Sequence, residues 1–178
     1  TLFPAEENPS MAGRPPMPEP TKEHAFLQQF AGEWETEAEM TMAPGQPPEK
    51  CRGHESSRLL GGFWVVGEME GQMPGGMGTM QGLILLGYDT DKQKYVGTWV
   101  DSTNGHQWEY EGTVDPSGRI LTLETEGPCL WKGPGAIARF KEVVEFKSRD
   151  HRVFTSSIQN DDGTWTQMVT VNYRRKSS

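Results

Sequence analysis

Hydrophobic and polar residues alternate along residues 33–42, which have the sequence EWETEAEMTM. Trp34, Ala38 and Met40 fall on one side of this segment, and the glutamates fall on the other. Successive side chains of a β-strand point to opposite faces of a sheet. The pattern therefore predicts a half-buried strand with an acidic outer face.

Similar strand patterns follow up to the end of the chain, separated by turn-forming Gly, Pro, Asp and Asn residues. Most of the connections have hairpin length, so consecutive strands should run antiparallel. About ten strands are predicted, over residues 33–42, 51–60, 63–71, 80–89, 94–102, 106–114, 120–127, 137–148, 152–160 and 165–176.

A series of hairpin-linked strands leaves two unpaired edges unless the sheet closes on itself. We therefore predict an all-β fold, a single antiparallel up-and-down β-barrel of about ten strands. A barrel of this strand number is wide enough to hold a small ligand. A two-sheet sandwich is the alternative fold.

One short helix is predicted before the first strand, within TKEHAFLQQFAGEW at residues 21–34. Thr21 can cap its start, Phe26, Leu27 and Phe30 fall on one helical face, and Gly32 ends it. A helix of this kind can close one end of a barrel.

The first twenty residues form a Pro-rich arm, and the barrel domain is predicted over residues 21–178. Composition alone favours an extended, flexible segment. If the arm is ordered, it must lie on its own domain or on a neighbouring subunit. A homodimer built through the arm is therefore one expectation, and it would suit a non-catalytic interaction protein.

The net charge of -8 disfavours binding to nucleic acid and to anionic membranes, because like charges repel. No apolar run approaches the roughly 18 residues that a membrane helix needs. The chain begins with Thr1 rather than Met, which fits a cleaved signal peptide or a removed tag. A bacterial cytoplasmic location is slightly favoured, with a secreted or periplasmic one as the alternative.

Two cysteines, Cys51 and Cys129, allow at most one disulfide, and two buried thiols are favoured. The chain has no CxxC motif, and its four histidines are scattered over separate predicted elements. Neither a metal site nor a cofactor is predicted from these spacings.

The GEW motif at residues 32–34, after a short helix, and Tyr173, Arg174 and Arg175 on the last strand resemble the calycins, which include lipocalins and fatty-acid-binding proteins. In calycins the tryptophan of this motif packs beneath a basic residue of the final strand. Such a cation–π contact contributes about 0.5–2 kcal/mol.

A longer set of segments, from EHAFLQQFAGEW through GYDTDKQKYVGTWVDS to VNYRRK, resembles a bacterial domain-of-unknown-function family, the one numbered fifteen seventy-nine. The resemblance runs from about residue 24 to residue 176. It implies a lipocalin-like barrel with no established activity, and it supplies no catalytic residues.

Strand alternation places a set of aromatic and titratable side chains on the inner face. Such a set is typical of a pocket lining, although ordinary core packing is the alternative. For residues 94–102 the opposite face, with Val96, Thr98 and Val100, is equally suited to point inward. The candidate ligand-binding residues are Trp99, Asp101, His106, Trp108, Tyr110, Phe140 and Glu142.

Glu142 is the most informative candidate, because a carboxylate inside an apolar barrel must be paired or protonated. It can anchor a ligand, act as a general base, or form a salt bridge to Arg58 or another inward arginine. The favoured function is binding of a small apolar or amphipathic molecule inside the barrel. One alternative is an enzyme that uses Glu142 or His106 as acid or base. By analogy with haem-binding calycins, His106 is also the one candidate for a haem ligand.

Overall fold

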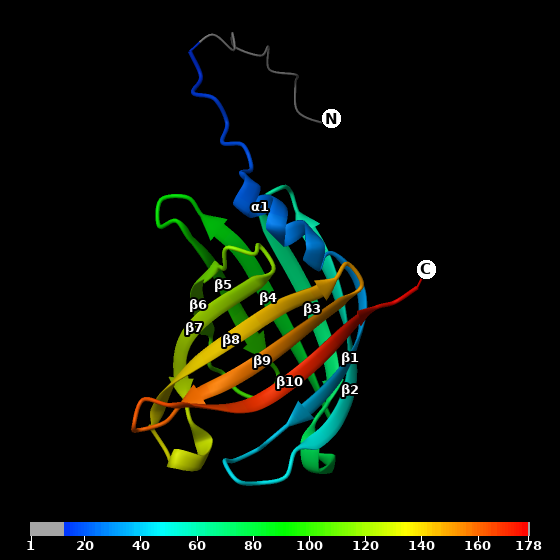
Figure 1. The fold of residues 1–178 in the computed structure, drawn as a ribbon, viewed down its shortest axis with the longest axis vertical. Coiled ribbons are helices and arrows are strands. Elements are labelled where there is room, and N and C mark those ends of the chain that lie inside the picture. The colour runs from blue at the N-terminus through cyan, green and yellow to red at the C-terminus, as the bar shows by residue number, and fades with distance from the viewer. Residues whose placement is uncertain (1–12, 178) are drawn as a thin grey trace, which may run out of the picture.

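Ten antiparallel strands form a closed barrel in the computed structural model, which describes residues 13–177 (Figure 1). Each strand pairs with the next one in the sequence, and the last pairs with the first. The all-β barrel prediction is confirmed, and the sandwich alternative is wrong. The strands are β1 (Gly32–Met40), β2 (Glu49–Leu60), β3 (Trp64–Gln72), β4 (Thr79–Asp89), β5 (Lys94–Asp101), β6 (Trp108–Val114), β7 (Ile120–Pro128), β8 (Ile137–Ser148), β9 (His151–Gln159) and β10 (Trp165–Arg175).

One end of the barrel is closed by α1 (Lys22–Leu27) and the 3-10 turn η1 (Gln28–Phe30) that follows it (Figure 1). The predicted apolar face of this segment is the face that packs: Leu27 and Phe30 are buried. The ring of Phe26 meets that of Phe146 with centroids 5.7 Å apart. The helix therefore plugs the barrel with the residues that its sequence pattern marks as apolar.

His24 fixes the helix to the barrel wall. Its Nδ1 accepts a hydrogen bond from the backbone N–H of Thr21 (2.9 Å), which caps the first turn. Its Nε2 donates to the carbonyl of Tyr88 on β4 (3.1 Å). Both ring nitrogens of this buried histidine are thus satisfied in the neutral form, and this role explains its position without any ligand.

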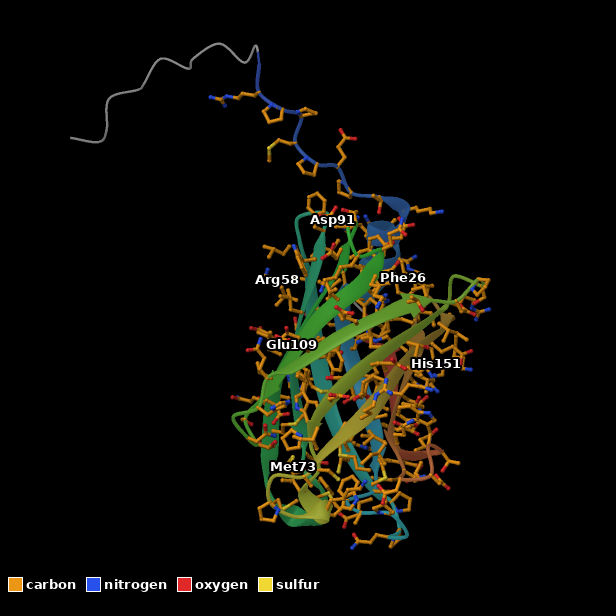
Figure 2. The ribbon with its side chains drawn as sticks, turned by 90° about the vertical axis from the view of Figure 1, so that its left-hand side faces the viewer. Phe26, Arg58, Met73, Asp91, Glu109 and His151 are labelled. Carbon is orange, nitrogen blue, oxygen red and sulfur yellow. The ribbon has the colours of Figure 1, made fainter. Side chains whose placement is uncertain are left out.

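The opposite end of the barrel, here called the mouth, is formed by the loops that follow β1, β3, β5, β7 and β9 (Figure 1). Two of these loops contain single 3-10 turns, η2 (Pro74–Gly76) and η3 (Leu130–Lys132). Figure 2 shows Met73 at the mouth and Phe26 at the helix end. Cys51 and Cys129 are both buried free thiols, as the sequence favours.

The buried side chains form three clusters rather than one. The largest lies at the helix end and includes Leu27, Leu121 and Phe146. A second lies against β1, β2 and β10 around Trp34, and a third lies near the mouth around Ile158. The interior is densely filled beside the helix, whereas many inward side chains nearer the mouth are only partly buried.

The described part of the Pro-rich arm, residues 13–20, is exposed and outside any helix or strand. The first twelve residues lie outside the described part of the chain, so the domain boundary and the arm-mediated dimer stay predictions. Within residues 13–177, no helix is long and apolar enough to cross a membrane.

Gly112 on β6 gives a test of the barrel register. A Cβ atom there would overlap the carbonyl oxygen of Thr122 on β7, which is backbone and cannot rotate away. Gly112→Ala should therefore destabilise the protein by about 1–3 kcal/mol or more, measured by urea unfolding. Gly105→Ala is the control, since no atom lies within 4 Å of its Cβ position. Equal stabilities of the two variants would contradict this register.

Candidate functional site

Trp34 lies between two arginines at the closed end of the barrel. The guanidinium of Arg175, from the last strand, is 4.2 Å from its ring centroid, and that of Arg152 is 4.3 Å away. Arg175 also donates to the carbonyl of Ala31 (2.6 Å). The tryptophan–arginine contact that the calycin resemblance implies is therefore present, and it joins the chain end to the helix segment.

Arg152 is a fully buried cation inside the barrel. Its Nη2 pairs with Oε2 of Glu55 at 2.5 Å, and both side chains are almost inaccessible. Its guanidinium also lies over the rings of Trp34, Tyr173 (4.0 Å) and Phe30 (5.0 Å). Glu55 accepts a second hydrogen bond from the Ser57 hydroxyl (2.9 Å). The arginine thus has a counter-ion and a shell of aromatic faces.

Removal of one member of this pair should be costly. Arg152→Leu leaves the Glu55 carboxylate buried without a cation, and a loss of about 3–5 kcal/mol is expected in chemical unfolding. The double variant Glu55→Gln/Arg152→Leu should recover part of that loss. Lys132→Ala is the control, because its pair with Asp161 is exposed and contributes about 1 kcal/mol or less. A double variant less stable than Arg152→Leu alone would contradict the pairing.

Five of the seven candidate residues gather towards the mouth. Trp99 and Trp108 are direct partners across β5 and β6. The Trp108 ring contacts His106 (4.7 Å between centroids) and Phe140 (5.2 Å), both edge to face. Asp101 accepts a hydrogen bond from Nε1 of Trp99 (2.8 Å). On β5, the face with Trp99 rather than Val96, Thr98 and Val100 packs against the core.

Inward glycines make room for the two indoles. A Cβ atom on Gly82 would enter the ring of Trp99, and one on Gly127 would enter the ring of Trp108. Each tryptophan ring therefore occupies the space that a side chain at the glycine of the neighbouring strand would fill. The sequence analysis did not identify these glycines. They could have been recognised because strand alternation places both of them at inward-facing positions.

Asp101 supports the loop that follows β5 rather than offering a free carboxylate. Besides the indole N–H, it accepts the backbone N–H (2.8 Å) and the hydroxyl of Thr103. Asn104 in turn accepts the backbone N–H of His106 (2.8 Å). These turn contacts set the position of His106, whose Nε2 is buried without a partner among the described residues.

Tyr110 and Glu142 lie deeper, and both are buried. Glu142 is only 8% exposed, yet its Oε2 has no hydrogen-bond partner within residues 13–177. The salt bridge considered from sequence does not form: Arg58 is exposed, pointing away from the barrel in Figure 2, and Arg152 is paired with Glu55. The carboxyl group is therefore buried without a counter-ion.

Thr125 is the diagonal neighbour of Glu142 across β7 and β8, and its buried hydroxyl oxygen is also without a partner in the described chain. Buried polar atoms are normally hydrogen-bonded, so two such atoms on neighbouring strands call for an explanation. His106 and Glu142 do not hydrogen-bond each other, and the structure therefore does not assemble them into an acid–base pair.

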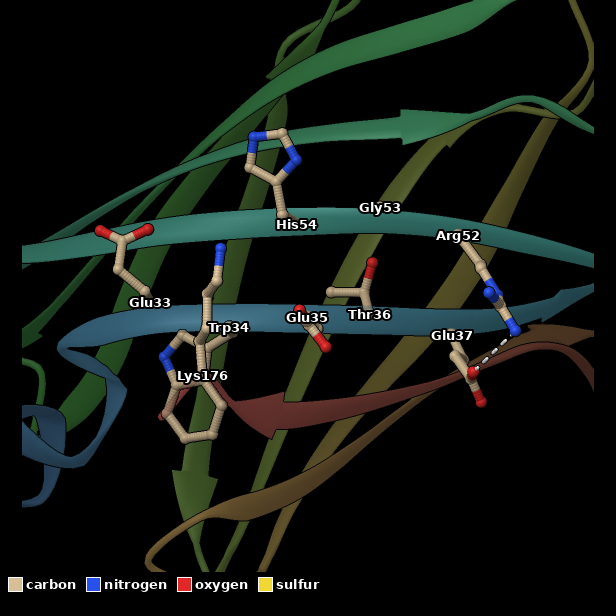
Figure 3. A pocket seen from close by; sticks show the side chains of 9 residues that line it. All are labelled: Glu33, Trp34, Glu35, Thr36, Glu37, Arg52, Gly53, His54 and Lys176. Atoms are coloured by element: carbon tan, nitrogen blue, oxygen red, sulfur yellow. Dashed lines mark ion pairs between the residues drawn. The ribbon is translucent and has the colours of Figure 1, made fainter. Parts of the chain in front are cut away.

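Two hollows of the surface lie outside the barrel interior. One, of about 530 Å³, follows β1 and β2 and is lined by outward side chains such as Glu35 and His54, with Lys176 nearby (Figure 3). The Glu37–Arg52 pair (3.6 Å) crosses it. The other, of about 590 Å³, lies over β2 to β5. Both are open to solvent. No group of three potential metal ligands occurs in residues 13–177.

Comparison with models of protein families shows to which family the chain belongs. The model of a family described as "Protein of unknown function (DUF1579)" matches residues 19–175, nearly the whole sequence. The chain belongs to this family. A search of curated proteins found no match to this DUF1579 protein.

Two solved structures share the fold of this DUF1579 protein. The S-type phycobiliprotein lyase CPES from Guillardia theta is 15% identical, with a TM-score of 0.60 over 86% of this chain and 92% of the lyase. Rv2717c from M. tuberculosis is 10% identical, with a TM-score of 0.61 over 89% of this chain and 100% of the other. At such identities the likeness establishes the lipocalin-like barrel and nothing further.

Burial raises the pKa of Glu142 from 4.5 to about 7, although the Ser156 hydroxyl opposes the shift. Below pH 4.5 this group is protonated in the folded and unfolded states alike. Between pH 4.5 and about 7 it ionises only in the unfolded chain, so the folded protein should lose stability as the pH rises. The total loss is about 3 kcal/mol, from 1.36 kcal/mol per pKa unit.

Glu142→Gln should remove this dependence. Its free energy of unfolding, relative to that of the parent protein, should rise by about 3 kcal/mol between acid and mildly alkaline pH. Glu145→Gln is the control, because Glu145 lies on the same strand and pairs with Lys147 at the surface (2.8 Å). Parallel pH profiles for all three proteins would show that Glu142 ionises normally.

Proposed function

We propose that this DUF1579 protein binds a small apolar or amphipathic molecule through the mouth of its barrel. The observation that carries the proposal is the partial exposure of inward aromatic side chains on the mouth side. Trp99, Trp108 and Phe140 pack against the core clusters and still retain accessible surface. Aromatic side chains combined with a few polar groups are the common lining of small-molecule sites.

The closed end supports entry from the mouth. At the helix end Leu27, Leu121 and Val65 are almost completely inaccessible, so no ligand can enter there without moving α1. Because the helix-end half of the interior is filled by side chains, the size of the ligand is limited to the space beside the indoles of Trp99 and Trp108. A flat ring system suits this position, because aromatic faces stack in offset or edge-to-face geometry.

Polar atoms deeper in the barrel favour an amphipathic ligand over a purely apolar one. Glu142 and Thr125 each present a buried oxygen without a partner in the described chain. Thr125 lies opposite Phe140, and Glu142 lies two residues further from the mouth along β8. A ligand polar group that reaches these oxygens would gain hydrogen bonds that the protein does not satisfy by itself. The seven residues predicted from sequence are proposed as the lining, with Asp101 supporting Trp99.

The interaction-protein and enzyme alternatives have less support. The acid–base mechanism needs groups within about 3 Å of each other or of a substrate, and His106 and Glu142 do not hydrogen-bond each other. The dimer depends on the arm, whose first twelve residues lie outside the described part of the chain.

Native mass spectrometry of the protein purified without added ligand tests the proposal. The expected result is a monomer carrying a small-molecule adduct, which Trp108→Leu should lose because it removes the flat ring next to Phe140. Trp64→Leu is the matched control, since Trp64 lies exposed at the helix-end start of β3. An absorption spectrum of the same sample tests the haem alternative at His106.

The same experiment can contradict the proposal. A bare mass for the parent protein, together with unchanged Trp fluorescence on titration with naphthyl or acyl amphiphiles, would remove the binding function. A dimeric mass would instead support the interaction protein.

A further inference from the structure

The free oxygen atoms inside the barrel are hydrogen-bond acceptors. Oε2 of Glu142 and Oγ1 of Thr125 are both buried, and neither has a partner within residues 13–177. Their residues are 8% and 6% exposed, and they are diagonal neighbours on the inner faces of β8 and β7. A carboxylate accepts hydrogen bonds only, and a threonine hydroxyl can accept one as well as donate one.

The charges that face this position are predominantly negative. Burial raises the pKa of Tyr110 on β6 and that of Tyr173 on β10, so both phenols stay neutral. After burial, Glu142 is the next cause at Tyr110, whereas at Tyr173 Glu55 contributes more than Glu142 does. Asp101 on β5 adds a second carboxylate towards the mouth, and it also acts on Tyr110.

The inward cation of Arg152 does not neutralise the negative charge around Glu142. Its charge is matched by Glu55, and the rings of Phe30, Trp34 and Tyr173 cover its faces. Its Nη1 is without a partner in the described chain, but the side chain is only 2% exposed. An anion that reached it from the mouth would have to pass Glu142 and lie beside Glu55.

We propose that the barrel selects ligands whose polar group is a hydrogen-bond donor, above all a protonated amine on a flat apolar body, and that it rejects carboxylates. The inference rests on the proposed function and adds the chemical class of the ligand. An ammonium group donates to Oε2 of Glu142 and supplies the missing counter-ion. A carboxylate brings a second negative charge into a site of low polarity, where like charges repel strongly.

The proposal is tested by comparing the affinities of three probes that share one ring system and differ in their polar group. The probes are 1-naphthylmethylamine, 1-naphthylmethanol and 1-naphthoate, titrated into the full chain by calorimetry at about pH 8. We expect the amine to bind about tenfold more tightly than the alcohol, since charge-assisted hydrogen bonds are the stronger ones. Binding of the naphthoate should be weaker than that of the alcohol.

The variant Glu142→Gln should bring the affinity of the amine to within about threefold of that of the alcohol, whose own affinity should change little. Glu145→Gln should leave all three affinities unchanged, because Glu145 pairs with Lys147 at the surface. The affinity of the parent protein for the amine should also rise from about pH 5.5 to 8.5, as Glu142 ionises while the ammonium stays charged. The Gln variant should show no such rise.

The other outcomes separate this inference from the proposed function. If the amine and the alcohol bind equally in the parent protein, the preference for donors is wrong while the binding function stands. Tightest binding of the naphthoate, abolished by Arg152→Lys, would overturn the inference and make Arg152 the anchor. No binding of any probe, alongside a bare native mass, would overturn the proposed function as well.

Discussion

The buried guanidinium of Arg152 is the constraint on which the architecture of this barrel depends. A cation inside a protein is tolerated only with a partner, and here Glu55 of β2 supplies the charge. The aromatic faces of Phe30, Trp34 and Tyr173 complete its surroundings. These contacts join the helix segment, the first two strands and the last two strands. They therefore support the closure of the barrel where its first strand, β1, pairs with its last strand, β10.

The packing around that centre divides the interior into two unequal parts. Beside the helix, aromatic and aliphatic side chains fill the space, and the neutral His24 anchors the plug to β4. Towards the mouth, the indoles of Trp99 and Trp108 lie over glycines and remain partly accessible. The densely packed end and the end at which we propose binding are thus opposite ends of the barrel. A ligand at the mouth would meet aromatic faces first and the unpaired Glu142 carboxyl group last.

The two buried carboxyl groups illustrate how environment assigns different roles to one residue type. Glu55 has a cation on one carboxylate oxygen and a hydroxyl donor on the other, so both of its oxygens are paired inside the protein. Glu142 has no cation, and burial raises its pKa to about 7. The first group is held by structural contacts, whereas the second is the one that we propose as a ligand anchor. Their sequence contexts, GHESS and FKEVV, contain nothing that distinguishes these roles.

The strand pattern was readable from the chain because alternation and turn residues act locally. The helix, the ten strands and the inward face of β8 all follow from patterns within about a dozen residues, and the closed barrel follows from the need to pair every edge. The seven candidate residues come from the same alternation, and their part in binding remains a prediction. No local pattern could pair Glu55 with Arg152, which is 97 positions away. Nor could it show that Oε2 of Glu142 would lack a hydrogen-bond partner within residues 13–177. Contacts across a barrel depend on the register of every strand pair and on the tilt that closure imposes, and only the assembled tertiary structure decides these.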